Sequence, residues 1–359
     1  MIPQNQRYPV WEVITIKPIL LENVSEGMIL AQDVVDRFGR ILIASGIPLK
    51  QELLKLLKKH EVVSVFVRDS KSSNFLIEST QDIASMEIRL KLITSVKETF
   101  STPHGLVEHL AELQYYVEDV VQTLIERKNV LLYLQDIDYA SDYLFMHSVN
   151  VGLFSIVIGI AMNLPHDQLC LLGMGGLLHD FGKTRISSEI LDKQGKLTLA
   201  EFNEIKEHAT VGYNTLKTDT QLDYRIMFMA LQHHERCNGS GYPWGISIDK
   251  IHHLARIVAV ADVYDALTTD RVYRSRLTTF AAMQIINQGD RIHFDTHVIE
   301  AFNKVAIPYP IGSSVTLNHG VDGKVIGLNS INLFRPLIST EQGIVNLLHE
   351  SDISIITTR

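Results

Sequence analysis

Residues 171–183 read Leu-Leu-Gly-Met-Gly-Gly-Leu-Leu-His-Asp-Phe-Gly-Lys. Apolar residues fill this stretch as far as Leu178, which predicts a helix buried in a protein core. The expected helix ends in His179 and Asp180, and Gly182 follows as a stop signal. An apolar helix has no packing reason to end in two adjacent ligand-type residues. The sequence therefore predicts a functional pair at this helix end.

The composition of the whole chain places this helix in an ordinary globular protein. Of 359 residues, 46% are hydrophobic and 21% are charged, and the length predicts two domains and a small third one. The net charge of −8 argues against binding of a nucleic-acid polymer. There are 15 histidines but only two cysteines, Cys170 and Cys237, which excludes a disulfide framework and a cysteine-rich zinc module.

We expect a mainly α fold in which a multi-helix bundle carries the site, with a small N-terminal α+β domain and a short C-terminal β segment. The expected boundaries are 1–70 for the α+β domain, 71–136 for a linker and connecting helices, 137–306 for the helical domain and 307–359 for the β-rich extension. Strand patterns at 14–16 and 62–67 flank a helical pattern at 49–60.

Further patterns support this division. Residues 70–82 are polar and read as a linker. Apolar residues between Leu106 and Leu124 recur at helical spacing but not as a strict heptad, which favours a core role over a dimer seam. Thr198 and Glu201 form a capping-box pattern, and Asp295 precedes a helix to about Val305. Residues 314–317 and 324–326 read as a β-hairpin, and residues 344–348 and 353–357 as strand candidates.

The longest apolar run, 151–162, is too short to span a membrane and reads as a buried helix. The N-terminus lacks the basic-then-apolar pattern of a signal peptide. We therefore expect a soluble cytoplasmic protein without a membrane span.

Metal-ligand residue types recur along the helical region, and each group lies on, or at the end of, a different expected helix. The groups are His147, His179-Asp180, His208, His233-His234 and Asp262. A lone histidine is more often packed or at the surface than a ligand, but helical bundles build metal sites from facing helices. Seven donors exceed the need of one ion and suit two ions that share a carboxylate, for which Asp180 is the natural candidate. Two such ions are the usual device for phosphoester hydrolysis.

Two motifs carry a family resemblance over roughly 137–302. His179-Asp180, together with the segment HHERCNGSGYP at 233–243, resembles the HD-GYP domain, a branch of the HD phosphohydrolase superfamily. The supporting matches are Lys193–Thr198, His208, Ala255–Ile257, Ala261–Thr268 and Asp270–Arg274. The segment around Glu26-Gly27-Met28 is similar to a small domain often found before HD-GYP domains.

The resemblance implies an HD-type bundle that hydrolyses cyclic di-GMP to pGpG and, in some members, to GMP. It implies one divalent ion on His147, His179, Asp180 and Asp262, and a second on Asp180, His208, His233 and His234. Iron or manganese is expected first, and nickel or zinc suits the same ligands. Some members bind a third ion through a Glu four residues before the first histidine. Tyr143 stands there in this chain, which argues against a third ion.

Substrate contacts are also implied by the resemblance. Lys183 would face a substrate phosphate, although a lysine at a helix end also fits a solvent-exposed role that stabilises the helix dipole. Arg271 and Arg274 are candidates for phosphate or guanine contacts. Gly241, Tyr242 and Pro243 would shape the pocket lip, or act only as loop structure. A cyclic dinucleotide carries two phosphates, so we expect a local basic pocket in the helical domain, whose cations are Lys183, Arg256, Arg271, Arg274 and Arg276.

Two other functions stay open at this point. One is a non-catalytic cyclic di-GMP receptor or scaffold that binds a diguanylate cyclase or another signalling protein through the GYP loop or the N-terminal domain. The other is hydrolysis of a different nucleotide phosphoester. A homodimer is compatible with either function.

Overall fold

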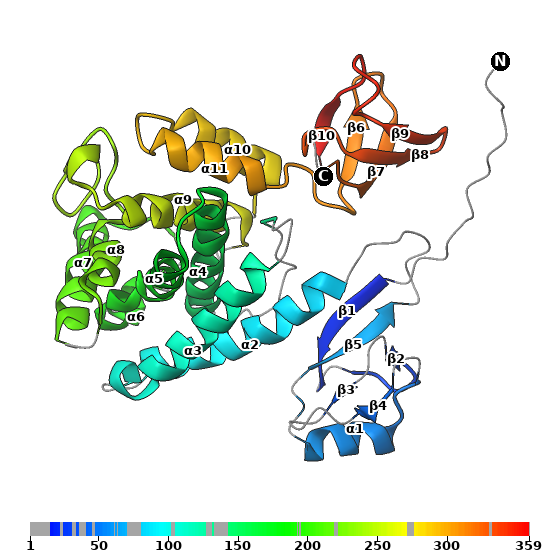
Figure 1. Cartoon of the computed structure of the whole chain (residues 1–359), viewed down its shortest axis with the longest axis horizontal. Helices are drawn as coiled ribbons and strands as arrows, with labels where there is room; N and C mark the ends of the chain where they lie inside the picture. The colour runs from blue at the N-terminus through cyan, green and yellow to red at the C-terminus, as the bar shows by residue number, and fades with distance from the viewer. Residues whose placement is uncertain are drawn as a thin grey trace.

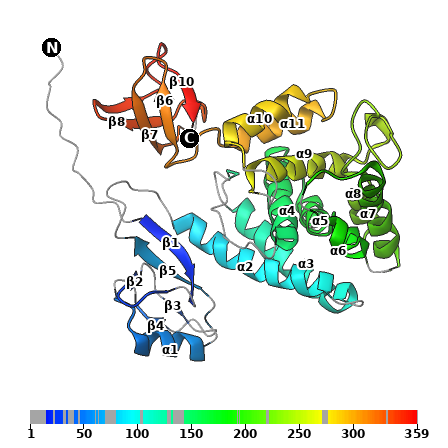
Figure 2. The same ribbon diagram turned by 180° about the vertical axis from the view of Figure 1, so that it is seen from behind.

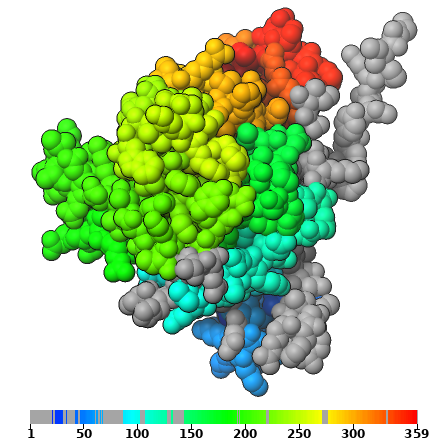
Figure 3. Space-filling model, turned by 60° about the vertical axis from the view of Figure 1, so that its left-hand side comes forward, coloured from blue at the N-terminus to red at the C-terminus, as the bar shows by residue number. Residues whose placement is uncertain are grey.

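The computed structural model describes residues 15–21, 24–30, 34–35, 41–44, 47–60, 62, 64–69, 80–101, 105–126, 131–132, 143–191, 193, 195–218, 222–270, 276–329 and 332–358. These residues form a helical bundle with a small β-containing unit at each end of the sequence (Figures 1 and 2). In the space-filling view the two units lie at opposite ends of the visible face (Figure 3). The expected mainly α fold class is confirmed.

The N-terminal unit combines a small antiparallel sheet with one helix. Its elements are β1 (Thr15–Leu20), β2 (Ile29–Leu30), β3 (Val34–Val35), β4 (Ile41–Ile43), α1 (Gln51–Lys59) and β5 (Ser64–Asp69). The strands β1, β5 and β2 pair in that order, and β3 pairs with β4. Leu30, Leu49 and Leu57 are fully buried and form a core separate from that of the bundle. Residues 38–40, where Phe38-Gly39-Arg40 also predicts a turn, lie outside the described residues.

The bundle contains the following helices. They are α2 (Thr80–Ser101), α3 (Gly105–Ile125), α4 (Tyr143–Ala161), α5 (His166–Leu178), η2 (Phe181–Arg185), α6 (Ser188–Leu191), α7 (Leu199–Lys217), α8 (Tyr224–Gln232), η3 (Ile248–Lys250), α9 (His253–Thr268), α10 (Thr279–Gln288) and α11 (Thr296–Val305). The capping box at Thr198 and Glu201 is present, and the Asp295 side chain caps α11, as predicted. Of the expected linker, residues 80–82 already belong to α2, and residues 70–79 lie outside the described part of the chain.

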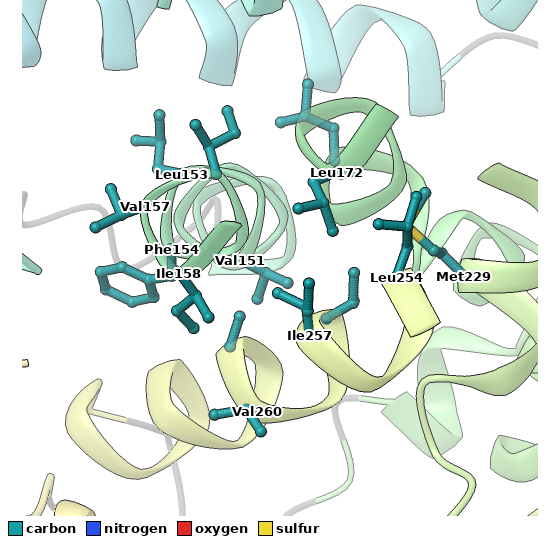
Figure 4. Packing of buried hydrophobic residues seen from close by; sticks show 14 of the residues in the cluster. Val151, Leu153, Phe154, Val157, Ile158, Leu172, Met229, Leu254, Ile257 and Val260 are labelled. Atoms are coloured by element: carbon teal, nitrogen blue, oxygen red, sulfur yellow. The ribbon is translucent and has the colours of Figure 1, made fainter. Parts of the chain in front are cut away.

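Helix α4 forms the centre of the bundle and packs against α5 on one side and α9 on another (Figure 4). Val151, Ile158 and Ile257 are fully buried at this junction. Leu113 and Val121 of α3 join the same core, so the predicted core role of these helical positions is confirmed. Helix α4 is the one described helix long and apolar enough to cross a membrane, yet 78% of it is buried inside the protein, as in a core helix.

The C-terminal unit is a five-stranded antiparallel sheet. Its strands are β6 (Ser314–Leu317), β7 (Asp322–Gly327), β8 (Leu337–Thr340), β9 (Gly343–Asn346) and β10 (Ile355–Thr358), in the order β10-β6-β7-β8-β9. The hairpin of β6 and β7 was predicted from the sequence, whereas β8 was not. Phe280 of α10 stacks on Tyr309 with ring centroids 5.3 Å apart, which packs the sheet core against the bundle.

Glycines allow α4 and α5 to approach each other closely. A Cβ added at Gly176 would lie 2.5 Å from the Cα atom and 2.7 Å from the backbone nitrogen of Gly152. Neither backbone atom can move aside as the end of a flexible side chain would. This approach fixes α5, and therefore the residues at its C-terminal end, relative to α4.

Gly176→Ala tests this packing. Alanine normally stabilises a helix interior by about 1 kcal/mol relative to glycine. Here we expect the reverse, a loss of about 1–3 kcal/mol in the free energy of unfolding, because the methyl group overpacks two backbones. Urea denaturation followed by the helical circular dichroism signal measures it. Gly327→Ala is the control, since its Cβ would meet Leu337 at an ordinary 3.7 Å. Equal stability of the two variants would contradict the argument.

Candidate metal centre

Five helical elements bring the seven predicted donors together in the interior of the bundle. His147 comes from α4, His179 and Asp180 follow the end of α5, and His208 comes from α7. His233 and His234 follow the end of α8, and Asp262 comes from α9. All but His234 are buried to 7% exposure or less, although they are polar or charged. Buried polar groups of this kind require partners.

Asp180 lies at the centre of the group. Its Oδ2 atom is 3.6 Å from His147 Nε2 and 3.3 Å from His179 Nε2, while its Oδ1 atom is 3.4 Å from His208 Nε2 and 3.9 Å from His233 Nε2. The two oxygens therefore face two different sets of imidazoles. His234 completes the second set, and Asp262, at 3.2 Å from His147 Nε2, completes the first.

Backbone carbonyls fix the orientation of three of the imidazoles. The Nδ1 atoms of His179, His208 and His233 lie 2.7 Å from Gly176 O, 2.6 Å from Ile205 O and 2.9 Å from Ala230 O, respectively. A carbonyl only accepts, so the proton of each neutral ring resides on Nδ1. Each Nε2 atom is then a bare lone pair that points toward Asp180.

Several of these nitrogen and oxygen atoms face one another with no proton available to form a hydrogen bond. His208 Nε2 and His233 Nε2 lie 3.3 Å apart, and neither carries a proton when both rings are neutral. His179 Nε2 and Asp180 Oδ1 are fully buried and have no hydrogen-bond partner. Such atoms are costly to bury unless a cation binds between them. Imidazole nitrogen and carboxylate oxygen are the donors that divalent iron, manganese, nickel and zinc accept. The two clusters therefore fit divalent metal ions.

The pKa directions of Asp180, His208 and His233 agree with a cation site. Burial by itself would raise the pKa of the Asp180 carboxyl, but His179, Lys183 and His208 hold it well below its usual range. Burial lowers the pKa of His233 and of His208, which keeps both rings neutral. Neutral imidazoles and ionised carboxylates are the forms that ligate metals.

His147 has a second carboxylate behind it that the sequence reasoning missed. Its Nδ1 atom lies 2.6 Å from Asp265 Oδ2, and Asn150 donates to the other oxygen of Asp265 at 2.7 Å. Burial by itself would lower the pKa of His147, whereas Asp262 and Asp265 raise it to about 9. The signal was present in the sequence, because Asp265 lies one helical turn after Asp262 on the same apolar helix.

Glu235 was likewise not singled out, although it follows the two histidines directly. Its carboxylate is 2% exposed and accepts hydrogen bonds from the backbone nitrogens of Trp244 at 2.7 Å and Ile246 at 3.1 Å. These two bonds hold the loop between α8 and η3 against the end of α8. Tyr242, in that loop, stacks on His234 with ring centroids 4.6 Å apart.

The predicted loop residues have defined places. A Cβ at Gly241 would lie 2.4 Å from backbone atoms of Glu235 and Arg236, so only glycine fits. Pro243 follows Tyr242 in the same loop and is half-buried. The structure thus brings Gly241 and Tyr242 beside His234, and Pro243 follows them in the loop.

The cations predicted to surround the site lie in different places, and two of them lie outside the described residues. Lys183 Nζ donates to Asp180 Oδ2 at 2.5 Å, so this lysine lies at the centre. Arg271 and Arg274 lie outside the described residues. Arg256 donates to Asp295 at 2.9 Å and to the backbone oxygens of Ile248 and Ile251, so it holds the segment before α9. The expectation that Arg256 adds to a basic pocket therefore has no support, because three acceptors occupy its guanidinium.

Tyr143, the residue that argued against a third ion in the sequence, stacks on His147 with centroids 5.8 Å apart and an interplanar angle of 7°. Arg276 pairs with Asp270 at 3.8 Å on the exposed side of the bundle.

This fold and site define the class: an α-helical domain with a buried cluster of histidines and aspartates in its interior. Residues 120–298 match the HD domain family, and the chain belongs to this family. The chain is 35% identical over 222 residues to cyclic di-GMP phosphodiesterase PA4108 of Pseudomonas aeruginosa, which covers 62% of this chain and 53% of that protein. It is 32% identical over 168 residues to 3'3'-cGAMP-specific phosphodiesterase 3 of Vibrio cholerae, which covers 47% of this chain and 36% of that one.

A solved structure shares the fold. The protein titled Bd1817, a HDG"Y"P protein from Bdellovibrio bacteriovorus, superimposes with a TM-score of 0.52 at 18% identity, over 81% of this chain and 99% of that chain. The likeness to this structure concerns the fold alone. The chain spans about half the length of the Pseudomonas relative and about a third of the Vibrio one.

Asp265→Asn tests the role of the second carboxylate. His147 and Asn150 each contact one oxygen of Asp265, so the NH₂ group of an asparagine would face one of these two donors. The amide would therefore neither orient His147 nor support its basicity as the carboxylate does. We expect divalent-metal affinity to fall about 10–100-fold, the usual cost of losing such a partner. Competition with a chromophoric chelator measures it. Asp249→Asn, an exposed carboxylate on η3, is the control. Unchanged affinity in Asp265→Asn would show that Asp265 is dispensable.

Glu235→Gln tests the anchoring of the loop. The amide of glutamine would replace one of two charge-assisted acceptors by a donor. We expect a loss of about 1.5–3 kcal/mol in the local free energy of opening. Faster amide hydrogen exchange over residues 237–247 measures this loss. The exposed Glu207→Gln serves as the control, and equal exchange in both variants would refute the anchoring role.

Proposed function

We propose that this chain is a metal-dependent phosphodiesterase that hydrolyses cyclic di-GMP, and that the seven clustered residues hold two divalent ions. The observation that carries the proposal is the position of Asp180, whose two oxygens face two separate sets of imidazoles. A carboxylate placed in this way suits a bridge between two ions. Two ions in a dry helical interior are an established means of cleaving phosphodiesters.

The proposed ligand sets follow the two clusters. His147, His179 and Asp262 would hold one ion with Asp180, and His208, His233 and His234 would hold the other with Asp180. When bound, such ions supply Lewis-acid neutralisation of phosphoryl oxygens and lower the pKa of water. We propose iron or manganese as the native metal, as the resemblance implies, and nickel or zinc as the alternatives that the same nitrogen and oxygen donors suit.

The protein's own residues would orient the substrate. Lys183 is 24% exposed on its side chain and is within reach of the centre, so its ammonium group can bind a non-bridging phosphate oxygen as a point charge. Tyr242 stacks on His234, and its ring meets that of His208 edge to face with centroids 6.4 Å apart. The backbone carbonyls that accept from the Nδ1 atoms keep the histidines in one tautomer throughout the reaction.

The substrate is proposed from chemistry and from the named relatives. The Pseudomonas relative is named for cyclic di-GMP, while the Vibrio relative is named for 3'3'-cGAMP. Both are cyclic dinucleotides with two phosphodiester bonds, so the second is the competing substrate. We propose pGpG as the product, with GMP following when the linear dinucleotide binds again. Binding of a diguanylate cyclase through the GYP loop or the N-terminal unit is a compatible scaffold role, and a homodimer is compatible with both.

Hydrolysis by the metal-loaded protein tests the proposal. We expect cyclic di-GMP to be converted to pGpG faster than 3'3'-cGAMP is cleaved, as resolved by chromatography, and we expect the double substitution His179→Ala/Asp180→Ala to abolish both activities. Protein that binds two metal equivalents and leaves cyclic di-GMP intact would refute the enzyme and favour the receptor.

Lys183→Met separates substrate binding from metal binding. The substitution removes the cation but keeps the apolar stem. We expect kcat to fall about 100-fold or more, as for loss of one charge-stabilising group, with the metal content unchanged. Lys304→Met, an exposed lysine of α11, is the control. A variant that loses metal together with activity would assign Lys183 to the support of Asp180 instead.

A further inference from the structure

A separate group of metal-ligand residue types, outside the proposed catalytic centre, lies at the N-terminal end of α5. His166 and Cys170 are one helical turn apart on α5, and Glu118 faces them from α3. One donor atom from each residue lies within 4.8 Å of the others. Helix α5 has 13 residues, which separates this end from Asp180 by about 20 Å. The cluster therefore belongs to a different part of the bundle from the proposed catalytic centre.

The three side chains contact one another in pairs. Cys170 Sγ lies 3.2 Å from Glu118 Oε2 and 3.8 Å from His166 Nδ1, and His166 Nε2 lies 3.3 Å from Glu118 Oε1. The sulfur–oxygen distance of 3.2 Å and the nitrogen–oxygen distance of 3.3 Å are each close to the ligand-to-ligand spacing of tetrahedral coordination, in which bonds to sulfur are about 2.3 Å and bonds to nitrogen and oxygen about 2.0 Å. Rotation of the exposed side chains of Glu118 and His166 would let each present one atom to a shared ion. The side chains of Glu118 and His166 are 60% and 40% exposed, which leaves a free coordination position for water.

We propose that Glu118, His166 and Cys170 form a binding site for a thiophilic divalent cation, of which Zn²⁺ is the representative. The donor chemistry supports this assignment, because thiolate, imidazole and carboxylate are the three protein ligands of zinc, and the sulfur selects against magnesium and manganese. The site joins α3, which leads from the N-terminal side of the chain, to the helix whose far end carries His179 and Asp180. Bound metal would therefore restrain the approach of α3 to α5.

Binding has a defined proton balance. Without metal, burial and the hydrogen bond to Glu118 raise the pKa of the Cys170 thiol to about 12, so the sulfur carries its proton at neutral pH. The metal–sulfur bond forms as the sulfur–hydrogen bond breaks, and the proton passes to solvent. Each ion bound here therefore releases one proton, and no oxidant or reductant takes part.

Cobalt substitution in the full-length protein tests the site. Thiolate bound to Co²⁺ gives a near-ultraviolet charge-transfer band, whereas the proposed catalytic centre contains no sulfur and gives none. Under a non-thiol reductant, we expect titration with Co²⁺ to produce this band in the native chain, and we expect Zn²⁺ to remove it by competition. The band should be lost in Cys170→Ser and weakened in Glu118→Gln, with one fewer metal equivalent bound in the former.

The other cysteine is the matched control. Cys237 lies in the loop after α8, and Cys237→Ser should keep the band unchanged. No band in the native chain, or a band that persists in Cys170→Ser, overturns the proposal. Circular dichroism confirms that each variant is folded. Because the readout is spectroscopic, it stands whether or not the chain hydrolyses cyclic di-GMP.

Discussion

The arrangement of the bundle interior depends on one buried carboxylate, that of Asp180. Asp180 is 1% exposed and stays ionised, and four imidazole nitrogens lie within 4 Å of its oxygens. An ionised group in such a place is stable only when opposite charge or hydrogen bonds compensate for lost hydration. Lys183 provides part of that compensation from one side. The bare nitrogens require a cation on the others.

The surrounding packing keeps these groups in place. Glycines bring helices close enough that side chains of five elements meet at one carboxylate. Gly182, directly after the His-Asp pair, would place a Cβ 2.0 Å from the backbone oxygen of His208, so only glycine lets η2 lie against α7. Backbone carbonyls of α5, α7 and α8 then fix the imidazole rings. The apolar core and the polar centre therefore depend on each other, because the same close contacts between helices produce both.

Much of this could be predicted from the sequence where the signal is local. The capping box at Thr198, the apolar helix that ends at His179 and the β6–β7 hairpin all follow from short-range periodicity and end signals. The metal-type donors could be selected because each lies at a helix position that packing alone does not explain.

The partners of these residues could not be selected in the same way. Asp265 and Glu235 contact groups that only the tertiary fold brings to them. Arg256 donates instead to acceptors from two segments that are distant from it or precede it in the sequence. Strand β8 was missed because its short pattern of residues is ambiguous without its neighbours.

The most direct test of this account is the number of Mn²⁺ ions bound per chain, measured by elemental analysis in a Cys170→Ser background so that no thiolate contributes. We expect two ions in this chain, one in the same chain with His147→Ala, and less than one with Asp180→Ala, because only Asp180 serves both sets of imidazoles. A single ion without further substitution, or two ions retained in Asp180→Ala, would contradict the claim that this carboxylate joins two sites.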